Sequence, residues 1–343
     1  IIFCAIIALI AISCDDSNDP WGKPSNTPVV IPRTCFAQTP LPANSKSRAV
    51  EVCAPESWDE VETPATRTYA VIDPDNASEY FQYWSPGDAI SLFFTTQNLQ
   101  YQMQSYLDGT QDIGLFELVG EATQGTELTT GYYYSVYPYK AETSISKRGK
   151  ITYNFPTTQH YNGDSYANGE NGMVAIEPIP TDSVLYFQNF CSYLQLRMVS
   201  DAGDTKSVKK ITLTANDTKN TIAGAGDIEV DDVPVVEMKR SATNQIVLDC
   251  SGGVELSQDI NNPSMFWFVL PGDITFTQGF TIIVIFDDNS YFKHSTSKQI
   301  SIARSHIKPM ATFKPTSVEP NESIRYKYND TSIDEPYPLN NTF

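Results

Sequence analysis

The residue with the most informative chemistry is Cys14, which closes an almost wholly apolar run that starts at Ile1. Small residues precede the cysteine and two aspartates follow it. Such a pattern is typical of a bacterial lipoprotein signal peptide, whose cysteine receives the lipid. The apolar run of roughly 13 residues is too short for a spanning helix, which needs about 20. We therefore expect residues 1–14 to be a signal peptide with lipidation at Cys14. The alternative is a buried core helix, which the acidic stretch after Cys14 cannot continue.

The other titratable residues do not form a recognisable catalytic pattern. His160, His294 and His306 have no triad or metal-ligand spacing. The carboxylates lie mainly in turns, and the acidic run Asp227–Asp232 lacks the Gly and Glu of an EF-hand loop. No Gly-rich phosphate loop is visible. We therefore predict a protein that is not an enzyme and has no cofactor or metal.

Aromatic side chains offer a second kind of chemistry, the stacking of sugar rings. Candidates lie in Tyr132–Tyr134 and at Tyr161, and Tyr133 and Tyr161 are the residues we would test for ligand binding. Strand alternation places some of these rings in a core instead. A glycan-binding surface lipoprotein is therefore the alternative function.

Composition limits the classes of partner. The net charge is −18, with 41 acidic and 23 basic residues. A chain this acidic does not present a phosphate-neutralising face, so nucleic acid is excluded as a partner. The acidity suits a soluble, self-repelling surface. Cys191 and Cys250 lie in apolar strand-like runs and are expected to be buried thiols.

The elements that position these residues read as strands. From Thr68 onward, short runs rich in Tyr, Phe, Thr, Val and Ile alternate with turn residues, as in an all-β sandwich. The predicted strands are Thr68–Ile72, Ala89–Thr95, Gly114–Leu118, Tyr132–Tyr137, Ile151–Phe155, Val184–Met198, Ser207–Leu213, Gly226–Val230, Gln245–Asp249, Met265–Leu270, Thr281–Asp287, Tyr291–Ser295 and Gln299–Ala303. The turns Asp201–Asp204 and Asp287–Ser290 are predicted to be hairpins.

The length fits two tandem antiparallel β-sandwiches. We expect a tether or propeptide at 15–66, an N-terminal sandwich at 67–180, a C-terminal sandwich at 181–314 and a tail at 315–343. Short apolar pieces within the tether segment could add an isolated strand or two.

Several ordered motifs resemble the fimbrillin family, the subunits of type V pili. They are Phe81-x-x-Trp84-x-x-Gly87-Asp88-x-Ile90, Tyr134-x-x-Tyr137-Pro138-Tyr139, Phe155-Pro156-x-x-Gln159, Met173-Val174-Ala175, Leu185-x-Phe187-x-Asn189-x-x-Ser192-x-Leu194, Ile222-Ala223-Gly224, Phe268-Val269-Leu270-Pro271, Gly279-Phe280-Thr281 and Ile302-Ala303-Arg304. Their order spans residues 67–313. Many of the same aromatic residues would also serve a sandwich core.

The resemblance implies transthyretin-like sandwiches and assembly by strand exchange. In fimbrillins, a subunit reaches the surface as a lipoprotein, and an arginine-specific protease removes an N-terminal segment that includes one strand. A strand from another subunit then adds to the exposed edges. The candidate cuts follow Arg67, which directly precedes the first predicted sandwich strand, and Arg48. The alternative is that both are solvated loop arginines and that no cut occurs.

The tail departs from the family pattern. Ile324–Tyr328 alternates like a strand and could be a donor strand. The same surroundings resemble the segment that opens the repeats of BspA-like surface adhesins. A plain tail is the third alternative.

The resemblance therefore predicts a non-enzymatic, lipid-anchored protein of the outer membrane surface or of a fimbrium. Its expected partners are other pilus subunits or surface ligands. Its expected work is adhesion, pilus assembly or both.

Overall fold

The computed structural model describes residues 31–40, 50–52, 70–73, 76–85, 87–107, 110–122, 125–163, 165–178 and 184–316. Within these ranges the chain is all-β, with 26 strands in five sheets. No helix in the described part of the chain is long and apolar enough to cross a membrane. The predicted all-β sandwich class is confirmed.

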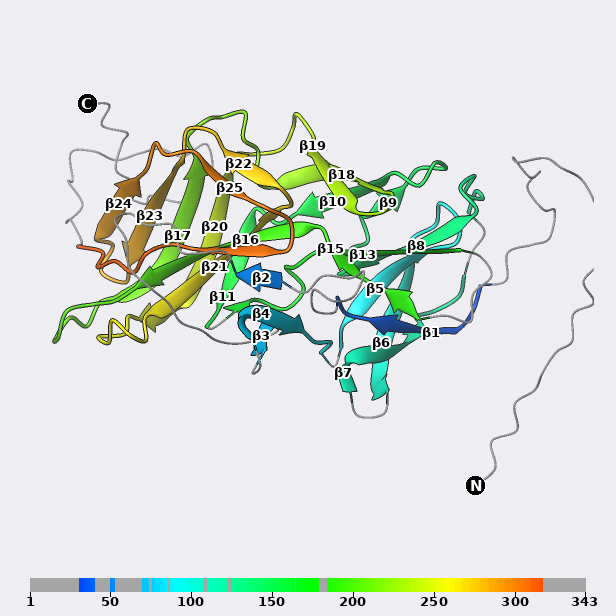
Figure 1. The fold of residues 1–343 in the computed structure, drawn as a ribbon, viewed down its shortest axis with the longest axis horizontal. Coiled ribbons are helices and arrows are strands. Elements are labelled where there is room, and N and C mark those ends of the chain that lie inside the picture. Colours follow the sequence, from blue (N-terminus) through cyan, green and yellow to red (C-terminus); the bar gives the residue numbers. More distant parts are fainter. Residues whose placement is uncertain are drawn as a thin grey trace, which may run out of the picture.

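The N-terminal sheet has eight strands and lies at one end of the long axis of the molecule, on the right in Figure 1. Its order is β14 (Leu185–Tyr186), β1 (Thr34–Gln38), β7 (Thr110–Leu118), β6 (Leu99–Leu107), β5 (Ala89–Phe93), β8 (Tyr132–Tyr137), β13 (Met173–Pro178) and β15 (Gln188–Asn189). Most neighbours are antiparallel. The exception is the β1–β14 pair, which is parallel.

The central sheet has six strands drawn from both halves of the sequence. Its order is β21 (Ser264–Pro271), β16 (Cys191–Met198), β26 (His306–Pro309), β2 (Val50–Val52), β4 (Asn76–Gln82) and β3 (Ala70–Asp73). The short strand β2 therefore joins the β3–β4 hairpin to the C-terminal strands, through parallel pairing with β26 and antiparallel pairing with β4.

The C-terminal sheet lies at the other end of the molecule (Figure 1). Its order is β12 (Ser165–Tyr166), β11 (Thr158–Asn162), β20 (Gln245–Glu255), β17 (Ser207–Ala215), β23 (Phe280–Phe286) and β24 (Tyr291–Ser295). Two smaller sheets complete the fold: β19 (Pro234–Met238), β18 (Gly224–Val230), β10 (Ile151–Phe155) and β9 (Ser144–Ile145), and the pair β22 (Ile274–Phe276) and β25 (Ile300–Ile302).

The buried side chains form three cores, and β16 separates two of them. Leu194, Leu196 and Met198 of β16 belong to the C-terminal core, packed under the C-terminal sheet. Cys191 and Tyr193 belong to the middle core, which also receives side chains from the N-terminal sheet. Since alternate residues of a strand point to opposite faces, a strand buried on both faces must be apolar throughout most of its length. This explains why all eight residues of β16 are buried.

The predicted strands agree with the structure at their cores, with one exception, and their bounds coincide for β8, β10 and β24. The prediction of a single strand over Val184–Met198 is wrong, because this segment forms β14 and β15 of the N-terminal sheet and β16 of the central sheet. The Asp287–Ser290 turn joins the antiparallel pair β23–β24, as predicted, with Asn289 at φ 64°. The prediction for Asp201–Asp204 is wrong. That turn leads from β16 in the central sheet to β17 in the C-terminal sheet, so it joins two strands that do not pair.

Strands from both sides of residues 180 and 181 share several sheets. β10 pairs with β18 in the small sheet, and β11 pairs with β20 in the C-terminal sheet. These sheets therefore contain strands from both segments, 67–180 and 181–314. The predicted division into two sandwiches at these bounds stays a prediction.

Candidate functional site around the N-terminal strand β1

The N-terminal segment contributes β1 to an internal position of the N-terminal sheet. β1 pairs antiparallel with β7 from Thr34 to Gln38, and parallel with β14 at Ala37 and Gln38 only. We define the β1 seat as β7, β14 and the buried side chains of Trp84, Tyr101, Phe116, Leu185 and Phe187, all of which belong to the N-terminal core with Ala37.

Further backbone bonds lengthen this contact at both ends of β1. The Leu118 N–H donates to the Arg33 carbonyl (2.8 Å), the Thr39 N–H donates to the Asp112 carbonyl (2.9 Å), and the Phe187 N–H donates to the Gln38 carbonyl (3.0 Å). The residues around β1 are thus held by main-chain bonds from both neighbouring strands. The ladder bonds fix the register of β1, and its inward side chains pack against the N-terminal core.

Two aromatic side chains bind the β1 segment directly. The indole Nε1 of Trp84 donates a 2.9 Å hydrogen bond to the Ala37 carbonyl, and the hydroxyl of Tyr101 donates to the Pro32 carbonyl. Trp84 is only 1% exposed. A buried Trp usually needs such an acceptor for its N–H, and here β1 provides it.

Trp84 is itself fixed by three rings that meet it edge to face. Its ring centroid lies 5.0 Å from that of Phe116, 5.3 Å from that of Tyr137 and 5.4 Å from that of Phe187. Edge-to-face pairs at this spacing are favourable by about 0.5–1.5 kcal/mol each beyond the area they bury. The seat therefore places a rigid hydrogen-bond donor opposite the middle of β1.

The turn after Trp84 explains the Gly87-Asp88 motif of the sequence. Gly87 has φ 93°, which strongly favours glycine. The Asp88 carboxylate accepts a 2.6 Å bond from the Ser85 N–H, and the Tyr137 hydroxyl lies 2.8 Å from its other oxygen. Burial raises the pKa of Asp88, and these hydrogen bonds oppose the rise. The carboxylate thus closes the turn that leads from Trp84 into β5.

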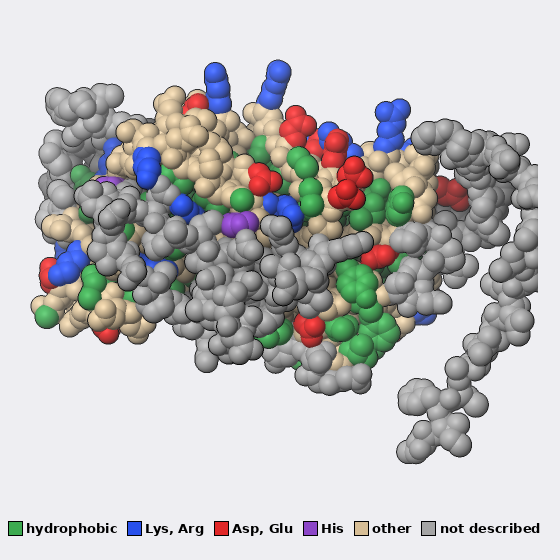
Figure 2. All heavy atoms as spheres, viewed as in Figure 1, with side chains coloured by type: hydrophobic (Ala, Val, Ile, Leu, Met, Phe, Trp, Pro, Cys, Tyr) green, Lys and Arg blue, Asp and Glu red, His purple; other side chains and the backbone are tan. Residues whose placement is uncertain are grey.

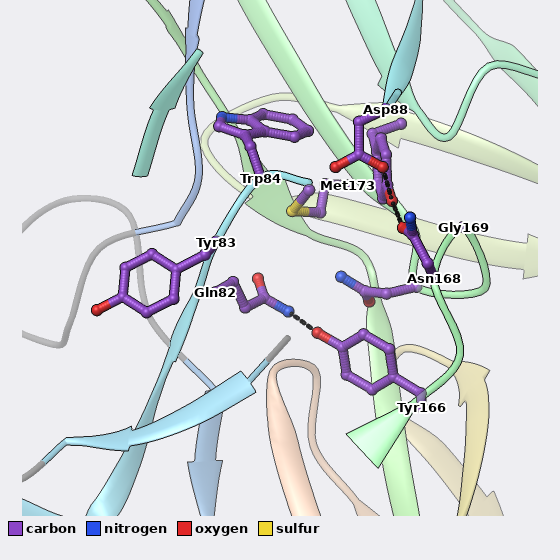
Figure 3. Close-up of a pocket in the computed structure, with 10 residues that line it drawn as sticks. Gln82, Tyr83, Trp84, Asp88, Tyr166, Asn168, Gly169 and Met173 are labelled. Carbon is purple, nitrogen blue, oxygen red and sulfur yellow. Dashed lines mark hydrogen bonds between the residues drawn. The ribbon is translucent and has the colours of Figure 1, made fainter. Parts of the chain in front are cut away.

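A small cavity lies beside this turn and is shown in Figure 3. Gln82, Trp84, Asp88, Tyr166 and Met173 contribute to its lining. Its volume of about 20 Å³ is enough for one water molecule and too small for a sugar or a nucleotide. The cavity is therefore too small to be a pocket for an organic ligand.

Buried polar side chains connect the central sheet to both of its large neighbours. Gln82 Nε2 of β4 donates to the hydroxyl of Tyr166 in β12, which belongs to the C-terminal sheet, at 2.6 Å, as Figure 3 shows. The hydroxyl of Tyr193 in β16 donates to Asn171 Oδ1, and Asn171 Nδ2 donates at 3.1 Å to Oδ1 of Asn189 in β15, which belongs to the N-terminal sheet. Buried polar groups are costly unless they are paired, so these bonds help to fix how the sheets meet.

The main titratable cluster of the interior centres on Glu170. Its Oε1 accepts from the backbone N–H of His160 (2.5 Å) and lies 3.0 Å from Nδ1 of the same residue. Burial raises the pKa of Glu170 to about 7, against the lowering effect of those bonds. Lys140 lies 4.2 Å from the Tyr153 ring centroid, and burial lowers its pKa to about 8. Shifted pKa values occur in active sites and in structural clusters alike.

The three cysteine thiols that the structure describes are not activated as nucleophiles. Burial raises the pKa of Cys35, Cys191 and Cys250 to about 12 in each case. A thiol reacts as its thiolate, so a raised pKa makes it inert near neutral pH. Both Cys191 and Cys250 are free and buried, which confirms the prediction for them.

Asp227, the first residue of the acidic run, is paired with basic side chains of the protein. Asp227 forms ion pairs with Lys239 (3.0 Å) and Lys150 (3.5 Å), and the Thr152 hydroxyl donates to it (2.8 Å). Partial burial raises its pKa, but the bonds from Lys239 and Thr152 outweigh this and lower it overall. Figure 2 shows acidic side chains over this region mixed with basic and hydrophobic ones. Within the described ranges, no group of three potential metal ligands is present.

The predicted site residues fall into two groups. Cys14, Arg48 and Arg67 lie outside the described residues, as does the strand-like tail segment Ile324–Tyr328. The two tyrosines of the glycan hypothesis are described.

Tyr133 is 3% exposed and stacks on Phe94 with ring centroids 5.2 Å apart. Tyr161 is half-buried, and its centroid lies 5.1 Å from that of Phe266. A ring buried like Tyr133 offers no face to a sugar, so these two residues do not form the surface platform that the hypothesis needs.

Sequence reasoning missed the residues that define the contact of β1 with its seat. β1 itself, Ala37 and the facing Gly114 were not predicted to have a role. The pattern Cys35-x-Ala37 does alternate, but five residues without a large inward apolar side chain give a weak strand signal.

Comparison with known proteins gives structural matches only. No family model matches the chain, and no curated protein matches it. A candidate cell adhesion protein of Bacteroides ovatus is similar over 79% of this chain and 96% of its own, at 14% identity and a TM-score of 0.44. Another, from Bacteroides uniformis, covers 69% of this chain and 90% of its own, at 15% identity and a TM-score of 0.42. The tip fimbrial protein Mfa3 of Porphyromonas gingivalis covers 64% of this chain and 87% of its own, at 11% identity and a TM-score of 0.24.

Proposed function

We propose that this protein is a non-enzymatic, fimbrillin-like surface subunit that acts in adhesion or pilus assembly, with β1 as a removable strand. In this proposal, β1 fills the β1 seat until the chain is cut after it. A strand from another chain then takes its place.

The observation that supports this proposal is the position of β1. It precedes both candidate cuts in the sequence, yet it occupies an internal place in the N-terminal sheet. Its removal would leave the facing edges of β7 and β14 without a partner. Unpaired strand edges are ready templates for another strand. A cut after β1 would therefore create an assembly site in the N-terminal sheet.

The two candidate cuts have different consequences. A cut after Arg48 separates β1 and leaves β2 on the main chain. A cut after Arg67 separates β2 as well, and β2 is the strand that joins β4 to β26. The sequence alone slightly favours Arg67. The pairing of β2 favours Arg48, because this cut keeps the central sheet continuous.

Lipidation at Cys14 completes the proposal. The lipid would hold the uncut chain on the outer membrane surface, and β1 would stay with the anchor when the main chain is cut. The glycan-binding alternative has no such support, since Tyr133 is buried.

Mass analysis of the N-terminus of the native protein tests this directly. We expect a new N-terminus at Ala49 or Thr68. A population that consists only of full-length chains with lipid at Cys14 would contradict the cleaved, polymerising subunit.

An engineered cut tests the mechanism in the purified full chain. A recognition sequence for a site-specific protease is placed between residues 43 and 49. Cleavage should allow β1 to leave and an added β1 peptide to replace it. The matched control carries the same recognition sequence in the Asp201–Asp204 turn, where a cut should leave the two pieces together through β16 and its neighbours.

A further inference from the structure

We infer that the β1 seat selects its strand by size at one position, the one that Ala37 occupies, and accepts only alanine or glycine there. The inference rests on the proposed strand exchange. It identifies the partner as a strand of another chain that carries one of these residues opposite Gly114.

The register brings Ala37 to the narrowest point of the seat. Ala37 is paired with Gly114 on β7 and with Leu185 on β14. Paired residues of neighbouring strands point to the same face of the sheet, so all three face the N-terminal core. Ala37 is fully buried, and Leu185 is 1% exposed.

The contacts that a side chain at Gly114 would make show how little space exists beside Ala37. A Cβ atom at Gly114 would lie 2.8 Å from Phe116 Cε2, 3.3 Å from Met103 Cε and 3.4 Å from Trp84 Cδ1. The first distance is shorter than real contacts allow. The space beside Ala37 on β7 is thus already filled by the rings of Phe116 and Trp84.

The backbone of the bound strand cannot easily move away to make room. Trp84 donates its indole hydrogen to the Ala37 carbonyl, and the three rings around Trp84 hold that donor in place. A larger side chain at this position must push on the same indole that binds the carbonyl. Overpacking of this kind is unfavourable in well-packed cores.

The strand-like segment of this chain's own tail does not meet the requirement. Residues 315–343 contain no alanine and no glycine. If it bound as an extended strand, Ile324–Tyr328 would place its Ile and Tyr side chains on one face and its Arg and Lys side chains on the other, so either face would bring a large group to the narrow point. The seat therefore takes its strand from a source other than Ile324–Tyr328 of a second copy.

Peptide exchange in the nicked full chain tests the inference. After the engineered cut near Arg48, synthetic peptides compete with a fluorescent peptide of residues 31–39. The set contains the unchanged sequence, Ala37→Gly, Ala37→Leu, Thr34→Leu and a peptide of residues 322–330. Thr34→Leu is the matched control, since Thr34 is exposed on the same strand.

We expect the unchanged, Ala37→Gly and Thr34→Leu peptides to bind within about threefold of one another. Ala37→Leu and the tail peptide should bind about ten- to a hundredfold more weakly. Equal binding of all five peptides would overturn the size selection and leave strand exchange standing. Failure of every peptide, including the unchanged one, would overturn the proposed strand exchange, and the inference with it.

The uncut chain gives a second measurement that does not depend on exchange. Ala37→Leu should speed hydrogen exchange of the β1 amides about tenfold or more, because overpacking favours local opening. Thr34→Leu should leave it unchanged. Equal exchange in both variants would contradict a narrow point at Ala37.

Discussion

The strands β1 and β16 both lie inside a sheet, but they are attached very differently. β16 pairs with β21 over eight residue pairs and with β26 over three, and both of its faces are buried in cores. β1 pairs over five residues on one side and two on the other, and Ala37 is its only fully buried apolar side chain. An internal position in a sheet therefore does not by itself determine how extensively a strand is attached. The length of pairing and the size of the buried side chains decide this.

The largest effect should come from the strongly attached region. Phe268 of β21 is fully buried in the C-terminal core, beside the β16 side chains that face the same way. Phe268→Ala should lower the free energy of unfolding by about 3–5 kcal/mol, since it removes a large buried ring and leaves a cavity. Urea denaturation measures the loss. Val235→Ala, at a side chain that is 57% exposed, is the control and should change it by less than about 0.5 kcal/mol.

A second test concerns the outer side of β21. Both bonding groups of the fully buried Gln159 side chain pair with one residue: Nε2 donates to the Val269 carbonyl (2.7 Å), and Oε1 accepts from the Val269 N–H (2.8 Å). Gln159→Leu leaves both main-chain groups unpaired and should cost about 2–4 kcal/mol in thermal or urea unfolding. Gln102→Leu, on the exposed face of β6, should cost little. Equal losses in the two variants would contradict the role of this pair.

The free energy of unfolding should depend on pH through the buried side chain of Glu170. Its folded pKa of about 7 lies above the ordinary value of 4.5. Between these values the folded protein retains a proton that the unfolded chain releases, so the free energy of unfolding falls as pH rises from about 4.5 to 7. The fall should be up to about 3 kcal/mol, and it should be complete above pH 7. Glu170→Gln should flatten this part of the stability curve. An unchanged slope in the variant would assign the dependence to other groups.

The smallest expected effect is local to the β1 seat. Trp84→Phe removes the N–H that donates to the Ala37 carbonyl. It should lower the free energy of local opening of β1 by about 1 kcal/mol. Hydrogen exchange should then be about fivefold faster at Cys35–Gln38 and unchanged in β16. The control is Tyr106→Phe, which removes the hydroxyl that donates to the Trp84 carbonyl and leaves the indole bond to Ala37 in place. If β16 exchanges faster as well, the two strands are not independent.

The sequence predicts the sandwich strands better than the arrangement of sheets. Turn residues and the content of aromatic and β-branched residues locate β8, β10 and β24 to the residue, because these properties are local. The parallel pairing of β11 with β20, and the insertion of β2 between β4 and β26, depend on contacts between distant segments. Local patterns contain no such information, and the wrong hairpin at Asp201–Asp204 has the same origin.

The candidate site was only partly predictable for a related reason. The Trp84, Gly87 and Asp88 motif pointed to a turn and a buried aromatic residue, and both are present. The narrow point at Ala37 exists because Ala37 has a small side chain and Gly114 has none. A small residue is conspicuous only when the side chains that crowd it are known, and Trp84, Met103 and Phe116 come from three different segments of the chain.

The Gln159 bonds to Val269 have one more consequence, which concerns solubility. β21 is an eight-residue, largely apolar strand at the edge of the central sheet as described, and strands of this kind are prone to aggregate edge to edge. The Gln159 amide occupies the outward N–H and C=O groups at the middle of that edge, as a neighbouring strand would. The Gln159 side chain, together with the adjacent strands β11 and β12, thus covers this edge of β21.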